Sequence, residues 1–466
     1  MSYLSIEFGL LFIIFFAFYW ACYLSPKLQN NLLLIISYLI VSSYSWQFAL
    51  ILFIYTCIIY FFSVIISKSE RHAKLWLIVS LFVSITNLAL FKYFDFFRYE
   101  IQALLNFWHL SIALPLISVL MPIGISFYTF HSISYLVSVK NKEIPVAKFW
   151  DFVLFLSFFP SIIAGPINRA KEFLPQIAIT QSRQIIEPFR AFTLIMLAVI
   201  KVYCFGALIN DNWVNPIFAN PIEFNVIDLL VGLYAYAIQL YLNFSGYTDL
   251  VTAIALLLGF RLPINFNFPY LALNLRDFWY RWHISLSNWI RDYIYIPLGG
   301  NRCGFIRTQI NVMLAMILSG LWHGAGINFI IWGAIHGLGI VALNIGDRYL
   351  GQGLVTKYLP TLARLLTWHY VCFTWLFFYC ESLSDVGDYF TALTSNFLIK
   401  PHYPEVFLIF CFICVIYSKC KTFPEWFIKQ LSKVNRVCLP FIFILIMWLT
   451  IYIAPSGVPN FIYANF

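Results

Sequence analysis

Charged residues are scarce in this chain of 466 residues. Asp, Glu, Lys and Arg together make up 11% of it, whereas hydrophobic residues make up 62% and aromatic residues 20%. Soluble domains average near half apolar and about a quarter charged, so this composition argues against a soluble globular fold. The mean hydropathy of +0.82 points the same way. The sequence therefore predicts a polytopic membrane protein.

The chain also lacks a long hydrophilic stretch, a fixed-period repeat and a low-complexity tract. Its apolar runs follow one another with short polar gaps, so we expect a single membrane domain over residues 1–466. A carrier built from inverted repeats would show paired broken helices in matching halves, but here the unusual residues gather in the middle. The net charge of +9 is spread over short loops, as the positive-inside rule requires, and does not indicate nucleic-acid binding.

No cysteine pattern supports a metal site or a disulfide. Most of the ten cysteines lie inside apolar runs, where a thiol behaves as a small hydrophobe. Cys411 and Cys414 have the CxxC spacing, but the sequence offers no second pair and no nearby histidine. The first apolar run has neither a basic region before it nor a small-residue cleavage site, which predicts a retained membrane span.

Apolar runs near the length that crosses a bilayer, about twenty residues, predict an all-α fold with roughly eleven spans. A polar stretch at 243–249 divides one region into two expected pieces, 226–242 and 250–260. Residues 149–165, broken at Pro160, are expected to be re-entrant, and an amphipathic stretch after Asp95 is expected to lie in the interface. The other expected spans are 4–24, 32–44, 48–66, 75–94, 115–137, 191–209, 362–379, 406–416 and 439–454, beside the central stretch.

The central stretch, residues 276–337, begins with a basic aromatic segment. Its first part carries four arginines and two aspartates, namely Arg276, Arg281, Arg291, Arg302, Asp277 and Asp292. A basic excess in a short loop predicts the cytoplasmic side. One interpretation is a surface helix that anchors the protein to anionic lipid. The other is a cytosolic entrance whose arginines bind a phosphate-bearing donor.

His323 lies in the apolar second part of this stretch, between Trp322 and a Gly-Ala-Gly break. An ionisable group in hydrocarbon is costly and usually marks a functional site. The functional interpretation is a general base that takes a proton from a hydroxyl as it attacks an acyl carbon. The alternative is a buried neutral imidazole bonded to a backbone carbonyl. The Gly-x-Ser-x-Gly pattern is absent, so a covalent triad is not expected.

Three other histidines deserve comparison with His323. His283 could face the same cavity from another element, or could simply lie at the interface. His336 follows His323 by thirteen residues, which on one continuous helix would place it about 20 Å away on a different face. We therefore expect a packing role for His336. His131, beside hydroxyl residues on a helix broken by Pro122 and Gly124, is a weaker site candidate.

Several motifs together resemble the membrane-bound O-acyltransferase (MBOAT) superfamily, and in particular its bacterial alginate O-acetylase branch. Two of them make up the signature region 276–337, namely residues 276–302 and 319–337. The others follow the order of that family and lie at residues 121–130, 159–166, 244–249 and 461–463. The chain departs from the usual branch residues at Ser138, Ser161 and Tyr280, which leaves the acceptor polymer open.

The resemblance implies an enzyme of the bacterial inner membrane with a central channel. His323 matches the family's catalytic histidine and His283 its second histidine. Such enzymes pass an acyl group from a cytosolic thioester, here expected to be acetyl-CoA, to an extracytoplasmic acceptor such as alginate, usually with a periplasmic partner protein. Arg276, Arg281 and Arg291 are the expected donor-binding residues, and no bound cofactor or metal is expected. Peptidoglycan O-acetylation, D-alanyl transfer and a non-catalytic exporter remain alternatives.

Overall fold

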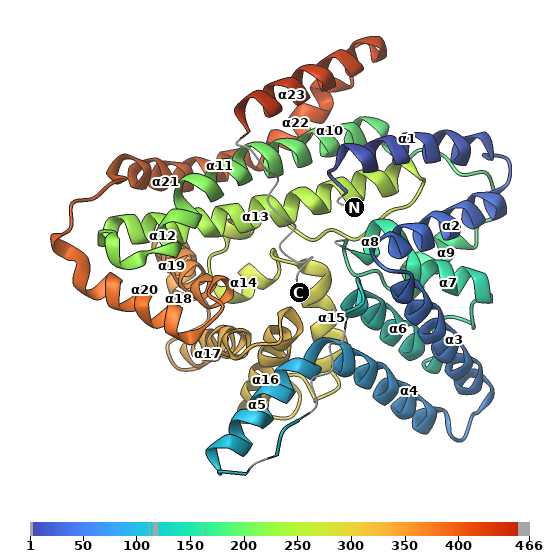
Figure 1. The fold of residues 1–466 in the computed structure, drawn as a ribbon, viewed down its shortest axis with the longest axis horizontal. Coiled ribbons are helices and arrows are strands. Elements are labelled where there is room, and N and C mark those ends of the chain that lie inside the picture. Colours follow the sequence, from blue (N-terminus) through green and yellow to red (C-terminus); the bar gives the residue numbers. More distant parts are fainter. Residues whose placement is uncertain (1–2, 111, 115–119, 164, 455–466) are drawn as a thin grey trace. The chain divides into compact units, whose positions relative to one another are not determined.

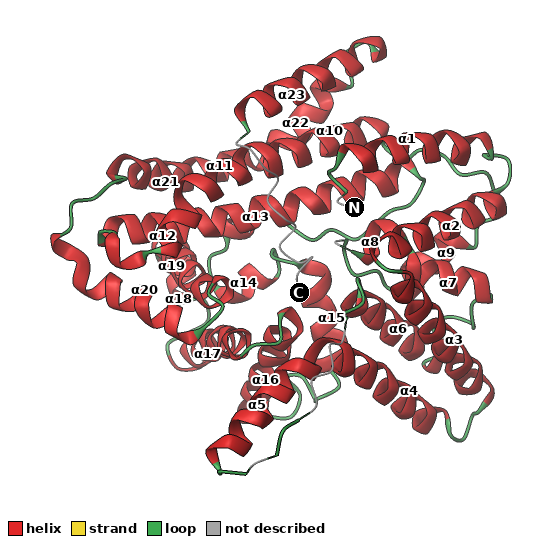
Figure 2. Cartoon of the chain, viewed as in Figure 1, coloured by secondary structure: helices red, strands yellow, loops and turns green. Residues whose placement is uncertain are grey.

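The computed structural model of the chain describes residues 3–110, 112–114, 120–163 and 165–454. Within these ranges every regular element is a helix (Figures 1 and 2), so the expected all-α fold is confirmed. The terminal motif at 461–463 and the expected start of a span at Pro115 lie outside the described residues. The chain forms two compact units, the first running to Glu187 with Ile254–Pro263 added, and the second containing Pro188–Ala253 and the residues from Ile264 onward.

The first unit consists of helices from the N-terminal part of the chain. They are α1 Ile6–Ala21, α2 Pro26–Tyr44, α3 Trp46–Lys68, α4 Ala73–Leu88, the π-helix η1 Ala89–Tyr93, α5 Phe94–Phe107, α6 Ile125–Lys140, α7 Phe149–Ser157, α8 Phe159–Ile162 and α9 Ala170–Ile177. The stretch α4–η1–α5 is continuous, so the expected amphipathic helix after Asp95 extends a span instead of standing alone. The break between α7 and α8 falls at Phe158, two residues before Pro160, because proline favours the start of a helix over its interior.

The second unit holds the remaining helices. They are α10 Pro188–Val199, η2 Ile200–Gly206, α11 Ala207–Ile209, η3 Asn210–Val214, α12 Asn215–Ala219, η4 Pro221–Glu223, α13 Val226–Leu257, η5 Pro269–Leu271, α14 Leu275–Trp279, α15 Ile284–Ile290, η6 Arg291–Tyr295, α16 Phe305–His323, α17 Ile327–Tyr349, α18 Leu354–Tyr358, α19 Pro360–Tyr379, α20 Leu383–Ser395, η7 Asn396–Leu398, α21 Pro404–Ile416, η8 Tyr417–Thr422, α22 Phe423–Leu431, η9 Arg436–Cys438 and α23 Leu439–Ile453. The end of α13 belongs to the first unit.

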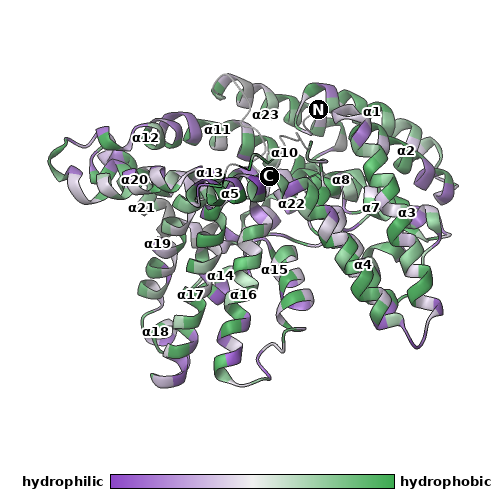
Figure 3. Ribbon diagram, turned by 60° about the horizontal axis from the view of Figure 1, so that its bottom comes forward, coloured by the Kyte–Doolittle hydropathy of each residue, from purple (hydrophilic) through white to green (hydrophobic). Residues whose placement is uncertain are grey.

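Six of the described helical stretches are long and apolar enough to cross a membrane, and two shorter ones are apolar. Hydrophobic residues run along α3, α4 and α17 (Figure 3). The polytopic membrane fold is therefore confirmed, while the number of spans, expected to be roughly eleven, stays a prediction.

Helix α13 differs from the expectation of two separate pieces, because it continues through the polar stretch 243–249. The neighbouring helix η2 accommodates that stretch. The Lys201 ammonium lies 2.6 Å from a carboxylate oxygen of Asp249, and a Cβ on Gly246 would come within 2.6 Å of Val202. Polar residues inside a span do not break a helix when adjacent protein satisfies them. The sequence pattern was misleading because it could not show this partner.

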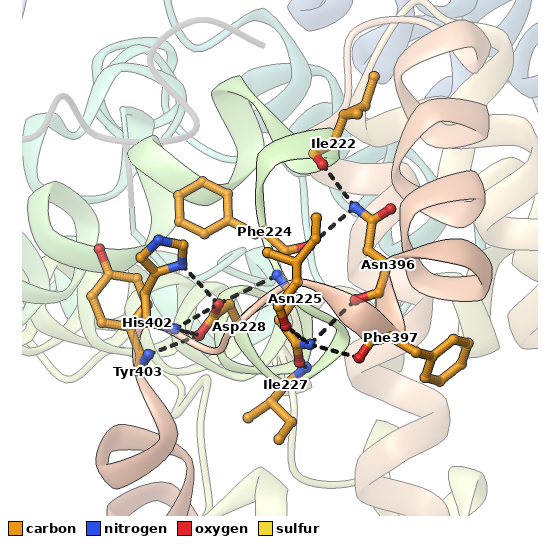
Figure 4. Close-up of polar contacts among 10 residues, drawn as sticks. Ile222, Phe224, Asn225, Ile227, Asp228, Asn396, Phe397, His402 and Tyr403 are labelled. Atoms are coloured by element: carbon orange, nitrogen blue, oxygen red, sulfur yellow. Dashed lines mark hydrogen bonds and ion pairs between the residues drawn. The ribbon is translucent and has the colours of Figure 1, made fainter.

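A buried carboxylate ties the start of α13 to the segment between α20 and α21 (Figure 4). Asp228 is fully buried and accepts hydrogen bonds from the backbone N–H groups of His402 and Tyr403, at 2.9 and 2.8 Å. The Nδ1 atom of His402 lies 3.2 Å from the same carboxylate. The Asn225 amide donates to backbone carbonyls of Asn396 and Ile399 in the same segment. These contacts hold the connection to α21 against α13.

Candidate functional site

The second half of the central stretch folds into a hairpin of two helices, α16 and α17, which lie side by side (Figure 1). Glycines allow this close approach. A Cβ on Gly333 would lie 2.3 Å from the Met316 carbonyl oxygen, and one on Gly320 would lie 2.1 Å from the Phe329 carbonyl oxygen. Small residues at a membrane-helix interface let the backbones meet in this way. The hairpin is thus a rigid support for the residues at its turn.

His323 is the last residue of α16 and is 1% exposed. It lies inside an aromatic cluster, with ring centroids at 5.1 Å from Trp332 of α17 and 5.2 Å from Phe378 of α19. Gly324 and Gly326 have extended backbone, which ends one helix before the next begins. His323 is therefore held at the point where the hairpin turns.

His283 lies beside His323, with the two ring centroids 6.3 Å apart. The structure thus brings together the two histidines that the sequence placed forty positions apart (323 minus 283). His283 is also fully buried, and its ring centroid lies 4.8 Å from that of Phe244 on α13, with the two rings nearly perpendicular. Both imidazoles therefore lie in one buried cluster.

The backbone around His283 explains how its ring is oriented. His283 caps the start of α15 with a φ of 41°, in the left-handed region that is unfavourable for a residue with a side chain. Asn265 supports this turn, because its carbonyl oxygen accepts from Ile284 N–H at 2.9 Å and its amide oxygen accepts from the Ser285 hydroxyl at 2.6 Å. Strain of this kind persists where surrounding contacts enforce it, often at functional sites. Asn265 lies eighteen positions before His283 (283 minus 265), and no sequence motif marks it as part of the site.

His336 is closer to the histidine pair than the sequence analysis expected. The idea of one continuous helix is wrong, because the chain turns between α16 and α17 and the two helices run back along each other. The Trp332 ring contacts both imidazoles, with its centroid 5.1 Å from that of His323 and 4.8 Å from that of His336.

The Nε2 atom of His336 lies 2.9 Å from the Thr374 hydroxyl, which itself donates to the Val371 carbonyl. A hydroxyl has one proton to donate. Thr374 therefore accepts from His336, whose Nε2 carries the proton.

A cavity of about 810 Å³ opens beside this cluster. It is formed by α14, α15, η6, α16 and α17, and its lining reaches Ser319, one turn before His323 on α16. The volume is in the range of cavities that hold small molecules and cofactors. The cavity wall thus comes within one helical turn of His323 on α16, although neither His283 nor His323 lines it.

The structure distributes the three expected donor-binding arginines unequally. Arg276 and Arg291 line the cavity, and Arg348 joins them there. Arg281 does not line it, because its guanidinium bonds the Asp277 carboxylate at 2.7 Å and the backbone of Asn267. The cavity wall therefore carries a cationic set different from the one expected.

The cavity arginines also have local partners. Arg276 pairs with Asp347 and donates to the Asn344 amide at 3.1 Å. Arg291 donates from Nε to the Asp292 carboxylate at 2.7 Å, and this hydrogen bond raises the pKa of Arg291 above its ordinary value. The Arg291 guanidinium therefore stays charged.

Side-chain amides form a second class of lining groups that the sequence analysis missed. They are Asn288, Asn301, Gln309, Asn344 and Gln352. The Asn344 amide donates to Gln309 at 2.9 Å, which joins α17 to α16 across the cavity wall. No local sequence pattern indicates that these residues line a cavity, because they come from several separate segments.

Two features of the sequence remain, namely His131 and the pair Cys411 and Cys414. His131 is fully buried, and its Nε2 accepts from the Asn168 backbone N–H at 3.0 Å while the Asn168 amide bonds the Ser161 hydroxyl at 2.9 Å. It thus supports the turn before α9. The described residues contain no group of three potential metal ligands among His, Cys, Asp and Glu, and the side chains of Cys411 and Cys414 lie outside the described part.

Comparison with known proteins places this architecture in a wider group. Residues 33–350 match the model of MBOAT, the membrane-bound O-acyltransferase family. The chain is 34% identical over 391 residues to a probable alginate O-acetylase of Pseudomonas aeruginosa. The aligned region covers 80% of this chain and 71% of that protein. It is 33% identical over 361 residues to a peptidoglycan O-acetyltransferase of Helicobacter pylori, covering 70% and 66%. A teichoic acid D-alanyltransferase of Bacillus subtilis is 29% identical over 278 residues, covering 55% and 68%.

Proposed function

The chain belongs to the membrane-bound O-acyltransferase family, and from this premise we propose that it moves an acetyl group from a cytosolic thioester to a hydroxyl of a cell-surface polysaccharide. It is an O-acyltransferase and a multi-pass membrane protein. The observation that carries the finer proposal is the buried histidine pair, with 6.3 Å between the ring centroids, near a cavity that Arg276, Arg291 and Arg348 line. The inner membrane of a bacterium is the proposed location.

His323 is the proposed general base. Its imidazole takes the proton from the acceptor hydroxyl while the hydroxyl oxygen forms a bond to the thioester carbonyl carbon. The carbon–sulfur bond then breaks, and the imidazolium returns the proton to the departing thiolate, which leaves as a thiol. His283, on the other side of the reacting group, is proposed to orient the acyl carbonyl. The surrounding aromatic rings exclude water, which protects the thioester from hydrolysis.

The 810 Å³ cavity is the proposed donor site. Acetyl-CoA carries phosphates at one end and a chain with amide bonds that ends in the thioester. Arg291 and Arg348 at the cavity wall suit the phosphates, and the lining amides suit hydrogen bonds to the chain. Ser319, one turn before His323, marks the end where the thioester would lie.

Alginate or a similar polysaccharide is the proposed acceptor, supported by the identity to alginate O-acetylases. Peptidoglycan is the second candidate, because the Helicobacter pylori relative covers 70% of the chain, and D-alanyl transfer by the same chemistry is a third. An extracytoplasmic acetyltransferase or esterase-like protein is the proposed partner. A non-catalytic exporter is the opposing hypothesis.

Transfer of radiolabelled acetyl from acetyl-CoA in membranes tests the proposal. Replacing a general base should lower transfer about a hundredfold or more, so we expect that loss for His323→Ala. His72→Ala, at an exposed histidine, is the matched control and should transfer at the parent rate. Equal transfer by His323→Ala and the parent, at equal protein level and monodispersity, would remove His323 as the base. Absence of acetyl transfer by the parent would favour the exporter.

A further inference from the structure

Trp332 of α17 carries a buried N–H group for which the described part of the chain offers no acceptor. Its side chain is fully buried, and none of the described residues places an acceptor within hydrogen-bond distance of the indole nitrogen. An unpaired buried N–H costs free energy, and such exceptions call for an explanation, of which catalytic use is one. A phenylalanine would fill much of the same space without this cost. The indole therefore indicates a ligand atom that accepts a hydrogen bond.

Packing on several sides fixes the Trp332 ring. It stacks on Trp375, with 5.6 Å between the centroids and 21° between the planes, and its centroid lies 5.5 Å from that of Phe378. The His336 ring lies on a further side, at 4.8 Å. A ring in a close-packed interior cannot turn its N–H toward a distant acceptor. The donor is thus held in place before any substrate arrives, which is the condition under which a hydrogen bond stabilises a transition state most.

Trp332 contacts both the lining of the proposed donor cavity and His323. Its ring centroid is 5.8 Å from that of Trp279, which lines the cavity, and 5.1 Å from that of His323. The backbone agrees with this placement. A Cβ on Gly320 would lie 3.1 Å from the backbone nitrogen that follows Trp332, so the two chains touch directly after the cavity residue Ser319. A thioester that reaches from the cavity to His323 therefore comes next to the Trp332 ring.

We propose that the Trp332 indole N–H donates a hydrogen bond to the carbonyl oxygen of the acyl group and stabilises the oxyanion that forms there. The inference rests on the acyl transfer proposed above. As the acceptor hydroxyl oxygen bonds to the carbonyl carbon, one electron pair of the C=O bond moves onto the carbonyl oxygen, and it returns when the carbon–sulfur bond breaks. The indole proton stays on its nitrogen throughout. A carbonyl oxygen has two lone pairs, so His283 can orient the same oxygen from a second direction.

The alternative is that Trp332 only packs against His323, and the two roles depend on different parts of the side chain. A packing role depends on the shape of the ring and not on its N–H. An oxyanion donor acts more strongly in the transition state than on the bound thioester. Loss of the N–H alone should therefore lower kcat about a hundredfold and leave the KM for acetyl-CoA nearly unchanged.

Transfer of radiolabelled acetyl from acetyl-CoA by the full chain in membranes compares three replacements. Trp332→Phe removes the N–H together with part of the ring. Benzothienylalanine, introduced in place of Trp332 by amber suppression, keeps the ring shape with sulfur instead of N–H, and it serves as the test if Trp332→Phe fails to fold. We expect both to lower kcat about a hundredfold at unchanged KM. Trp368→Phe, at a buried tryptophan of α19 that packs on Tyr270, is the matched control and should retain the parent rate.

The carbonyl stretch of bound acetyl-CoA adds a readout that reports the hydrogen bond itself. The probe is acetyl-CoA labelled with carbon-13 at the thioester carbonyl, and infrared difference spectra isolate its band. An accepted hydrogen bond weakens the C=O bond, so the band should lie at a lower wavenumber in the parent than in both Trp332 variants. The Trp368→Phe control should give the band of the parent.

The possible outcomes separate this inference from the proposed function. Transfer at the parent rate by a folded protein with benzothienylalanine, or a carbonyl band at the position of the parent, would overturn the role of Trp332 and leave acetyl transfer intact. Loss of transfer in Trp332→Phe with full transfer by the benzothienylalanine protein would assign the residue to packing. Absence of transfer by the parent would overturn the proposed function, and this inference with it.

Discussion

At the scale of single residues, Thr374 is the group that ties His336 into the aromatic cluster. Thr374→Val keeps the side-chain shape but leaves the buried His336 N–H without its acceptor, which costs about 1–3 kcal/mol. We expect this variant to unfold at a lower temperature in detergent than the parent. Thr374→Ser retains the hydroxyl and should unfold within a degree or two of the parent. Equal unfolding of Val, Ser and parent proteins would show that the hydrogen bond contributes nothing.

His283 can be tested separately for its backbone and its imidazole. Asparagine tolerates the left-handed conformation better than alanine, so His283→Asn should unfold close to the parent and His283→Ala earlier. If the imidazole orients the acyl group, both variants should lose acetyl transfer by about tenfold or more. Acetyl transfer is measured on the same preparations as unfolding. A stable and fully active His283→Asn protein would assign His283 to structure alone.

At the scale of elements, the packing of α16 against α17 depends on Gly333. A Cβ there would lie 2.3 Å from the Met316 carbonyl oxygen, so Gly333→Ala must push the helices apart. We expect a loss of about 1–3 kcal/mol, as for other overpacked sites. Gly346→Ala on the same helix adds a Cβ into open space and should be neutral or stabilising, by up to about 1 kcal/mol. The free energy of unfolding of both variants is measured by denaturation in the same detergent. An equal change in the two variants would refute the explanation by close contact at Gly333.

At the scale of the whole molecule, the side of the membrane on which residues 276–307 lie remains a prediction of the positive-inside rule. Cys303 is exposed in this segment and serves as a native reporter. A membrane-impermeant maleimide should label the parent and Cys303→Ser equally in intact cells, and the parent more strongly once the membrane is opened. Stronger labelling of the parent in intact cells would place the proposed donor cavity on the wrong side.

The sequence by itself determined the membrane class and the all-α fold, and it predicted the sites at His323 and His283. Hydrophobicity and helix propensity are local properties, and the motifs carrying both histidines are short continuous segments. Tertiary structure alone decided which residues meet. Asp249 stays inside one helix because Lys201 pairs with it, and His336 approaches His323 because α17 folds back on α16. Arg281 turns to Asp277, whereas Arg276 lines the cavity. Such contacts join distant segments and arise only when the helices pack, so no local pattern specifies them.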